Sequence, residues 1–369
     1  MKRLLCINAG GIGDLHGLRA RRLTEALAHD FNITYHDIDK SKSRFQNYLE
    51  IRTIIDSQTW DLIYQESTGI AGGLNLIRAA KKYNTPYIVS TGDPVGGFFH
   101  TVKGPLHGYS FSIYEKLLYR HAAGFVGWTP YLTGMALTLG AQRAITIEGA
   151  VDVHRFKPVT ISQKRHLKAQ FGLDPDHIVC GMVGSIKWVE RQKYCYGLEL
   201  VSMLPYLQRK DISLLIVGDG DGLTRLKSRV PETWKEQVIF TGRLTEQEVA
   251  TALNAMDIGF ITQTLDRLGN YRLTTKLPEY LASGLPIAMS PIPGFYDYVW
   301  PAGWALPPTH PASPEFHQQC ALWLESLSYE EITKKAQLAR SIAESRFDYQ
   351  VVIPRFTAFI RELLQHPRS

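Results

Sequence analysis

The chain has few cysteines and no long apolar run, and each absence argues against a class of protein. Four cysteines are too few for a disulfide framework, and none of them belongs to a CxxC or Cys/His cluster with metal-binding spacing. No stretch reaches the 18 apolar residues of a membrane-spanning helix, and the amino-terminal segment lacks the apolar core of a signal peptide. We therefore expect a protein of the reducing cytoplasm.

The sequence also lacks blocks of one charge and low-complexity segments. Hydrophobic residues make up 44% and charged residues 21% of the 369 positions, which is ordinary for a folded protein, and this length predicts two domains. Lys and Arg number 41 against 35 Asp and Glu, and the formal net charge of +6 suits an anionic ligand, a nucleic acid or an acidic membrane surface. Because the basic residues do not alternate with aromatic residues in a stripe, we expect no nucleic acid as a partner.

Short apolar segments alternate with helical segments, and this alternation occurs twice along the chain. The expected strands are residues 3–8, 33–37, 62–64, 87–89, 124–128 and 145–147, followed by 179–183, 214–217, 238–240, 258–261 and 287–289. Because parallel strands need helix-sized connections, the pattern predicts an α/β protein of two Rossmann-like domains, each a parallel sheet covered by helices on both faces. We expect these domains at residues 1–155 and 156–345.

An amphipathic segment, residues 346–369, closes the chain. Its apolar residues recur with helical spacing from Val352 to Leu364, and Pro354 within this pattern predicts a kink or a late start of the helix. The periodicity leaves open whether this helix completes the second domain or crosses back to the first.

Two glycine-rich loops follow expected strands. The loop of residues 10–13 (GGIG) could bring backbone N–H groups close to a phosphate at a helix start, or it could be a tight structural turn. It does not form the dinucleotide fingerprint GxGxxG, because the last glycine is replaced by His16. The loop of residues 218–222 (GDGDG) contains a D-x-D pair but lacks the further acidic ligands of a calcium loop, so we expect no metal there.

Residues 274–286 (TTKLPEYLASGLP) are the most informative run. Thr275 is expected to cap a helix, and Gly284 is expected to end it. Hydroxyl groups, Lys276 and Glu279 then converge at a helix start on the carboxyl edge of a sheet, where an anion is stabilised. The alternative is a purely structural helix, in which the dipole alone favours Glu279 in the first turn.

Five segments resemble, in order, the motifs of one enzyme family. They are residues 148–158 (EGAVDVHRFKP, like N-G-V-D-x-x-x-F-x-P), 216–220 (IVGDG, like V-G-x-G), 240–243 (FTGR, like F-x-G-x), 276–286 (KLPEYLASGLP, like K-x-x-E-Y-x-A-x-G-x-P) and 347–349 (FDY, like F-x-W). Over nearly its whole length the chain thus resembles the retaining nucleotide-sugar glycosyltransferases of the GT-B fold, group 1 or family 4-like. The resemblance implies an acceptor domain, then a donor domain across a cleft, and a last helix that returns to the first domain.

The activity that this resemblance implies is transfer of a sugar from a nucleotide-sugar donor to an acceptor hydroxyl, with retained configuration and without a metal or cofactor. The implied acceptor is a glycan, a lipid-linked molecule or a small molecule, as in glycan biosynthesis. The implied donor-binding residues are Gly10, Gly11, Gly218, Arg243, Thr274, Thr275, Lys276 and Glu279. Glu279 would accept hydrogen bonds from both ribose hydroxyls. The alternative is a catalytically silent nucleotide-sugar-binding or regulatory protein of the same fold.

The donor side departs from the family pattern at two places. Tyr271 stands where the first of two family glutamates is expected, so the donor sugar is less well specified than the ribose. Gly184-Ser185 replaces the family's glycine-arginine after the first strand of the second domain. We therefore expect Lys187, Arg191 or Lys193 to stabilise the charge that develops on the departing diphosphate.

The acceptor side is expected in residues 92–114, a glycine-rich stretch that predicts a mobile loop. Asp93 stands where the family often has a histidine, and Asp93 or His100 would accept or orient the acceptor hydroxyl. An exposed Phe98 and Phe99 would suit an apolar or lipid-linked acceptor at the inner face of a membrane. The alternative is a packed loop with two core phenylalanines.

Overall fold

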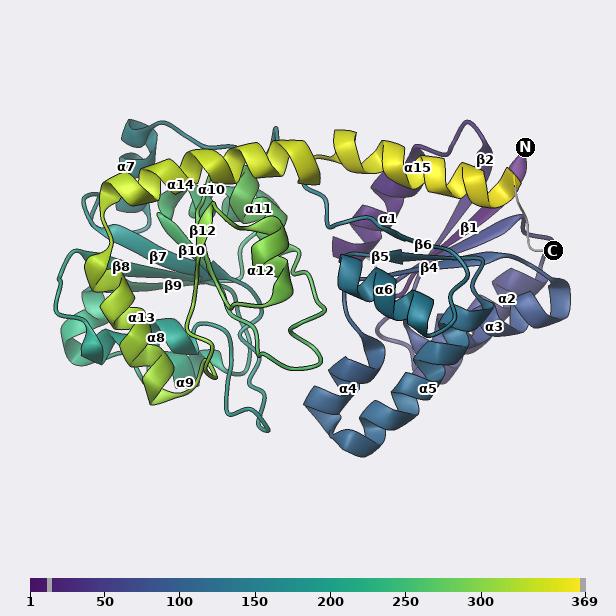
Figure 1. The fold of residues 1–369 in the computed structure, drawn as a ribbon, viewed down its shortest axis with the longest axis horizontal. Coiled ribbons are helices and arrows are strands. Elements are labelled where there is room, and N and C mark those ends of the chain that lie inside the picture. Colours follow the sequence, from purple (N-terminus) through teal and green to yellow (C-terminus); the bar gives the residue numbers. More distant parts are fainter. Residues whose placement is uncertain (12–14, 366–369) are drawn as a thin grey trace. The chain divides into compact units, whose positions relative to one another are not determined.

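The structure is a computed structural model that describes residues 1–11 and 15–365, and these form two compact units (Figure 1). Unit 1 consists of Met1–Ala150, Tyr271–Thr274 and Tyr349–Ser369, and unit 2 consists of Val151–Asn270 and Thr275–Asp348. Each unit contains a six-stranded parallel sheet. The predicted α/β fold with two Rossmann-like sheets is therefore confirmed.

Unit 1 has the strand order β2-β1-β3-β4-β5-β6. Its strands are β1 (Lys2–Asn8), β2 (Phe31–Asp37), β3 (Leu62–Glu66), β4 (Tyr87–Thr91), β5 (Gly124–Gly127) and β6 (Ala144–Thr146). Its helices are α1 (Leu15–Glu25), α2 (Arg44–Asp56), α3 (Ile70–Tyr83), α4 (Val95–Lys103), α5 (Pro105–His121), α6 (Pro130–Thr138) and α15 (Tyr349–Gln365).

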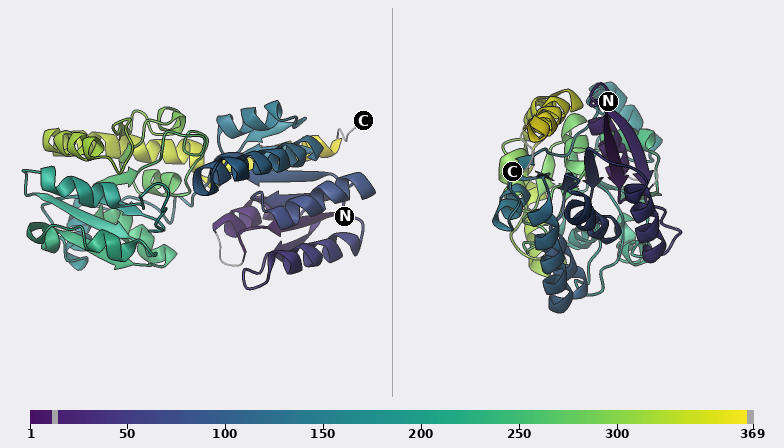
Figure 2. Two further views of the ribbon diagram at one scale, coloured as in Figure 1. Left: turned by 90° about the horizontal axis from the view of Figure 1, so that it is seen from below. Right: turned by 90° about the vertical axis from the view of Figure 1, so that its right-hand side faces the viewer.

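The sheet of unit 1 buries both of its faces, because successive side chains of a strand point to opposite sides. On β1, Leu5 and Ile7 pack with α2, α3, α5 and α6, whereas Leu4 and Cys6 pack with α1 and α15. The views in Figure 2 show this layer of strands between helices. The last helix of the chain thus belongs to unit 1, where Phe356 is fully buried.

Unit 2 has the strand order β12-β11-β10-β7-β8-β9. Its strands are β7 (Ile178–Val183), β8 (Ile212–Val217), β9 (Val238–Gly242), β10 (Ile258–Ile261), β11 (Ile287–Met289) and β12 (Gly303–Ala305). Its α-helices are α7 (Ile161–Gln170), α8 (Leu198–Met203), α9 (Leu223–Lys227), α10 (Glu246–Ala255), α11 (Lys276–Ala282), α12 (Pro293–Tyr298), α13 (Pro314–Ser326) and α14 (Tyr329–Ile342). Short 3-10 helices cover Leu204–Tyr206 and Glu232–Gln237, and a π-helical turn covers Ala343–Phe347.

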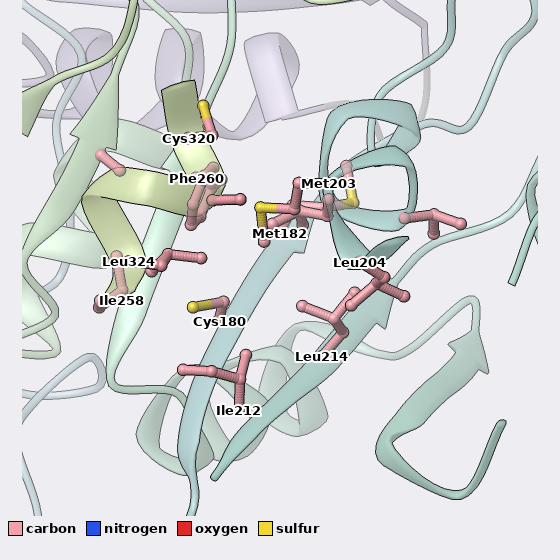
Figure 3. Close-up of a cluster of buried hydrophobic side chains, with 14 of the residues drawn as sticks. Cys180, Met182, Met203, Leu204, Ile212, Leu214, Ile258, Phe260, Cys320 and Leu324 are labelled. Atoms are coloured by element: carbon pink, nitrogen blue, oxygen red, sulfur yellow. The ribbon is translucent and has the colours of Figure 1, made fainter. Parts of the chain in front are cut away.

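One face of the sheet in unit 2 packs against α8 and α13 (Figure 3). Cys180 and Met182 of β7 and Phe260 of β10 meet Met203 of α8 and Cys320 of α13 there. Cys180, Cys320 and the third cysteine of this cluster, Cys195, are buried free thiols, and burial raises the pKa of each thiol. They therefore behave as packing residues and not as nucleophiles.

All eleven expected strands are present, and the structure adds β12, a strand of three residues at the edge of its sheet. The expectation of a late start for the last helix is wrong, since α15 begins at Tyr349 and runs through Pro354. A proline early in a helix removes few internal hydrogen bonds, and the buried apolar face of α15 outweighs that loss. None of the helices in the described part of the chain is both long and apolar enough to cross a bilayer.

The expected boundary after residue 155 lies five residues beyond the junction of the compact units at Ala150. The segment Tyr271–Thr274, which the sequence places in the second domain, packs in unit 1. The carbonyl of Tyr271 accepts a hydrogen bond from Thr129 Oγ1 at 2.8 Å, and its ring packs against the core of unit 1. The pattern of strands and helices in the sequence does not reveal that this segment packs in the other unit, because four residues are too few to show a periodicity.

The expected mobile loop at residues 92–114 is wrong, since this stretch forms most of a helical hairpin, α4 and α5. Its glycines allow the two helices to approach each other closely. A Cβ atom at Gly108 would lie 2.6 Å from that of His100, and one at Gly96 would overlap the side chain of Ser112. Phe99 is half-buried and stacks on Phe111, with ring centroids 3.5 Å apart, so its expected exposure is also wrong.

Candidate functional site

Unit 2 contains a cavity of about 430 Å³ at the carboxyl ends of β7 and β8. It is lined by Val183, Gly184, Ser185, Val217, Gly218, Asp219, Gly220, Arg243, Leu244, Val249 and Lys276. The strand order changes direction between β7 and β10, so the cavity lies beside the switch point of the sheet. Ligands of open parallel sheets bind at this position, outside the carboxyl ends of the strands.

Glycines shape the floor of this cavity. Gly218 has a φ of +141°, and a Cβ atom there would overlap the carbonyl oxygen of Gly184. The loops after β7 and β8 therefore touch backbone to backbone, and the N–H of Gly184 donates to the carbonyl of Val217 at 3.0 Å. Close approach of this kind leaves room for a ligand against the main chain.

Two cations line the cavity, Arg243 after β9 and Lys276 at the first position of α11. Lys276 Nζ lies 3.1 Å from Glu279 Oε2. Glu279 is 8% exposed, and its burial raises the pKa of the carboxyl although Lys276 opposes the shift. The cavity thus offers an anion two cationic side chains, one of which is oriented by a buried carboxylate.

The structure brings together three of the predicted donor-site residues, Gly218, Arg243 and Lys276, in one cavity. Glu279 lies behind Lys276 and does not line this cavity, so its contact with ribose stays a prediction. Thr275 occupies the N-cap position of α11, but its side chain makes no capping hydrogen bond, which corrects that expectation. The expected end of the helix is confirmed, since Gly284 follows α11 with a φ of +66°.

Thr274 and the amino-terminal glycines lie elsewhere, in unit 1. The N–H of Gly10 donates to Asn8 Oδ1 at 3.0 Å, and Gly11 adopts a φ of +83°. These contacts are those of a tight structural turn, which was the alternative to phosphate binding. The other two residues of the glycine loop, Ile12 and Gly13, lie outside the described residues.

The three cations predicted to hold the diphosphate are exposed in the loop between β7 and α8 and do not line the cavity. Lys193 forms an ion pair with Glu190, and its charge and hydrogen bond lower the pKa of that carboxyl to about 2. An isolated bridge between Val189 and Tyr194 closes this turn, with Arg191 inside it and Lys187 two residues before it. The structure therefore places Arg243 and Lys276, and not this turn, at the cavity.

Unit 1 contains a second cavity, of about 630 Å³, at the carboxyl ends of β1, β3 and β4. Its lining is largely apolar and comprises Ala9, His16, Ile38, Arg44, Phe45, Asn47, Tyr48, Ser67, Thr68, Gly69, Ile70, Ala71, Leu74, Thr91, Gly92, Asp93, Val95, Phe98 and Phe99. Like the cavity in unit 2, it adjoins the switch point of its sheet, here between β1 and β3.

Asp93 is the acidic group in the lining of this cavity, as the predicted acceptor role requires. Its Oδ1 lies 2.9 Å from Nε of Arg272, which belongs to the segment that packs in unit 1. His100, the other predicted acceptor residue, does not line this cavity. No motif in the sequence points to Arg272. His16 is notable in the sequence only because it replaces a glycine of the dinucleotide fingerprint, although it lines the cavity beside the ring of Trp128.

A buried polar cluster lies behind the edge of the sheet in unit 1. Arg19 and Glu66 form an ion pair of 2.8 Å, with 5% and 0% of their side chains exposed. Glu66 also accepts a hydrogen bond from Ser90 Oγ at 2.8 Å, and Arg19 donates to the carbonyl of Ile147 at 2.8 Å. The hydrogen bonds and the ion pair of this cluster link the carboxyl ends of β3, β4 and β6.

Residues 177–325, which lie in unit 2 except for Tyr271–Thr274, match the protein family described as glycosyl transferases group 1. No curated protein matches the chain. The match covers 149 of the 369 residues, so it places this family's pattern in the second half of the chain.

Solved structures resemble the chain over its whole length. HepE of Anabaena in complex with UDP-glucose has a TM-score of 0.75 at 16% identity, covering 98% of this chain and 100% of that one. Sucrose-phosphate synthase of Thermosynechococcus elongatus has a TM-score of 0.78 at 16% identity, covering 99% and 100%. A glycosyltransferase of Rickettsia africae has a TM-score of 0.69 at 14% identity, covering 99% of each chain. At these identities the likeness shows a shared fold, the GT-B fold.

Proposed function

We propose that the chain transfers a sugar from a nucleotide-sugar donor to an acceptor hydroxyl, with its donor bound in unit 2 and its acceptor in unit 1. The observation that carries this proposal is the cavity of unit 2, in which Arg243 and Lys276 meet glycine-rich backbone at the switch point of the sheet. A nucleoside diphosphate has the charge that such a cavity complements. HepE, which shares the fold, is seen with UDP and with UDP-glucose, so the uridine nucleotide is the first candidate to test.

The chemical step breaks the bond between the anomeric carbon and the diphosphate and forms a bond from that carbon to the acceptor oxygen, whose proton passes to the departing diphosphate or to solvent. Negative charge therefore grows on the leaving group. Arg243 and Lys276 are placed to stabilise that charge by electrostatic preorganisation. Two side-chain cations can perform this task without help, so we also propose that the reaction needs neither a metal nor another cofactor. Retention of configuration is also proposed, from the resemblance of the motifs in residues 148–158 and 276–286.

The cavity of unit 1 is the proposed acceptor site. Its apolar lining favours an acceptor with an apolar portion, and Asp93 can accept a hydrogen bond from the acceptor hydroxyl. Replacing Asp93 by Asn keeps the size of the side chain and removes its charge. We expect this variant to bind the donor normally and to transfer sugar more slowly. Unchanged turnover would remove Asp93 from the reaction.

The donor proposal is tested first by thermal shift with uridine, guanosine, adenosine and thymidine diphosphates. A ligand at 100 times its dissociation constant stabilises the folded chain by about 2.7 kcal/mol, which such an assay detects. Arg243→Ala should weaken binding of the preferred nucleotide by about 1.5–3 kcal/mol, the range for hydrogen bonds to charged groups. Lys193→Ala is the matched control, since it removes an exposed cation outside the cavity. The opposite ranking would move the phosphate site to the turn after β7.

The alternative, a catalytically silent nucleotide-sugar binder, shares the fold and the cavity but not the turnover. Tyr271, which replaces a family glutamate and packs in unit 1, favours it. The two functions are separated by incubating the chain with the preferred nucleotide sugar and a panel of hydroxyl acceptors. Released nucleoside diphosphate with a new glycoside supports the transferase, and tight binding without release supports the silent binder. Proton NMR of the new glycoside then reads its anomeric configuration, and chelation of metals tests the metal independence.

A further inference from the structure

Helix α5 carries a row of large apolar side chains that face solvent. Leu106 is 84% exposed, Tyr109 72%, Ile113 48% and Leu117 43%. At 100° per residue these four positions fall within an arc of about 80° on one side of the helix. A row of this kind is more regular than scattered surface residues, and exposed apolar rows are typical of binding faces.

The opposite side of α5 is already occupied by α4. Gly96 and Gly108 bring the two helices together, and the buried Glu115 of α5 accepts hydrogen bonds from the N–H groups of Val95 and Gly96 at 2.9 and 3.0 Å. The hairpin projects from the sheet of unit 1 in Figure 1. The exposed row is therefore not the packing side of the hairpin.

The charges exposed on this hairpin are of one sign. Between residues 95 and 121 the charged side chains are those of Lys103, Glu115, Lys116 and Arg120, and the carboxylate among them is 3% exposed. All three cations are exposed. Lys116 and Arg120 fall on the same side of α5 as the apolar row, because they lie three and seven residues after Ile113. We call Leu106, Tyr109, Ile113, Lys116 and Leu117 the hairpin face.

We propose that the hairpin face docks the chain on the surface of an anionic lipid bilayer. Helices that lie in a membrane interface combine an apolar face with lysine and arginine, whose charges are attracted to anionic lipids. A protein partner fits less well, since lysine is depleted in the cores of protein interfaces. A second copy of the chain would bring like charges together across the contact.

The position of α4 connects membrane docking with the proposed acceptor site. Val95, Phe98 and Phe99 of α4 line the apolar cavity of unit 1, so the helix pair that meets the lipid also forms a wall of the proposed acceptor site. Docking would therefore place that wall next to molecules carried in the bilayer. This use rests on the proposed function, whereas docking itself does not and is tested by lipid binding alone.

Sedimentation of the full-length chain with vesicles tests the apolar contribution. The chain should bind vesicles that contain phosphatidylglycerol more tightly than vesicles of phosphatidylcholine alone. Leu106→Ser combined with Ile113→Ser should weaken binding about tenfold or more, from the apolar surface that no longer inserts. Leu322→Ser combined with Ile161→Ser is the matched control, because these side chains of unit 2 are 71% and 82% exposed. Circular dichroism and the binding of the preferred nucleotide check that both variants are folded.

The charge contribution is tested separately. Lys103→Gln with Lys116→Gln should weaken binding to anionic vesicles about fivefold per charge, and added salt should abolish the difference. Lys157→Gln with Lys334→Gln removes two exposed cations of unit 2 and serves as the control. Absence of binding to anionic vesicles, equal binding to both vesicle types, or equal losses in test and control pairs would overturn the proposal. So would a dimer in sedimentation equilibrium that the Leu106 and Ile113 substitutions dissociate, since the face would then bind a second copy.

Discussion

Replacement of Glu279 by Gln tests the predicted contact between this residue and the donor ribose. A carboxylate can accept hydrogen bonds from two vicinal hydroxyls, whereas an amide has a single acceptor atom. Because Glu279 is 8% exposed, such bonds would be shielded from water and would lie in the range for charged partners. We expect a loss of about 1.5–3 kcal/mol, which is about a 13- to 160-fold rise in the Kd for the nucleoside diphosphate.

The structure offers a competing explanation, because Glu279 also lies 3.1 Å from Lys276. If Glu279 acts only by orienting Lys276, its replacement would affect the phosphates and not the ribose. The two roles are separated by titration calorimetry of parent and Glu279→Gln with the nucleotide and with its 2′-deoxy analogue. A ribose contact predicts that the parent binds the deoxy analogue more weakly and that this penalty disappears in the variant. The same penalty in both proteins would refute the ribose assignment.

The pH dependence of donor binding gives a second readout of the same group. Burial raises the pKa of Glu279, and the ionised carboxylate is the form that accepts both hydrogen bonds. Affinity should therefore be full above this raised pKa and decrease as the pH falls through it, earlier than an ordinary glutamate with a value of 4.5 would allow. Measurement with the nucleotide sugar avoids the terminal phosphate proton of the free diphosphate. The decrease should be missing from Glu279→Gln, and an identical pH profile would contradict this account.

Three further substitutions test the packing that supports the two cavities. Gly218→Ala places a Cβ atom against the Gly184 carbonyl at a positive φ, and it should lower the free energy of unfolding in urea by about 2 kcal/mol or more. Gly134→Ala is the control, because Gly134 has open space around it on α6, and it should raise this free energy by about 0.5–1 kcal/mol. Equal unfolding midpoints of the two variants would contradict the geometry. Glu66→Gln leaves the buried Arg19 without its counter-charge and should cost about 3–5 kcal/mol in the same assay, so a loss below about 1 kcal/mol would show that the pair is not structurally important. Burial raises the pKa of Glu115, so the stabilising contribution of its carboxyl is full below the ordinary value of 4.5 and is lost as the pH rises through the folded pKa. Glu115→Gln should therefore gain stability relative to the parent as the pH rises. A difference in thermal unfolding between the two proteins that does not change with pH would refute this.

The architecture was largely predictable from the sequence, because it depends on periodicity. Eleven strands were expected and all are present, since the central strands of each sheet are short apolar runs that are buried on both faces. The end of α11 at Gly284 was also predictable, because a left-handed residue after a helix favours glycine. Local preferences of this kind act within a few residues, so a single sequence reveals them.

The composition of the two cavities was decided by the tertiary structure. Arg243 and Lys276 follow different strands, and their meeting depends on how the loops after β7, β8 and β9 close over the sheet. Lys193 follows a strand just as they do, but Glu190 pairs with it three residues away. Sequence position predicts the edge of the sheet at which a side chain lies, but not whether a neighbour takes up its charge.

The hairpin of α4 and α5 shows the same difference between what local sequence predicts and what tertiary contacts decide. Its glycines suggested a mobile loop, because glycine lowers the helix propensity of a single segment. In the folded chain they permit contact between two helices, and the hydrogen bonds of Glu115 hold the start of α4 in place. The positions of the strands and their parallel arrangement follow from local apolar patterns, so the sequence by itself determined them. The helical hairpin, the excursion of Tyr271–Thr274 into unit 1 and the lining of both cavities depend on contacts between distant segments, which only the tertiary structure decides.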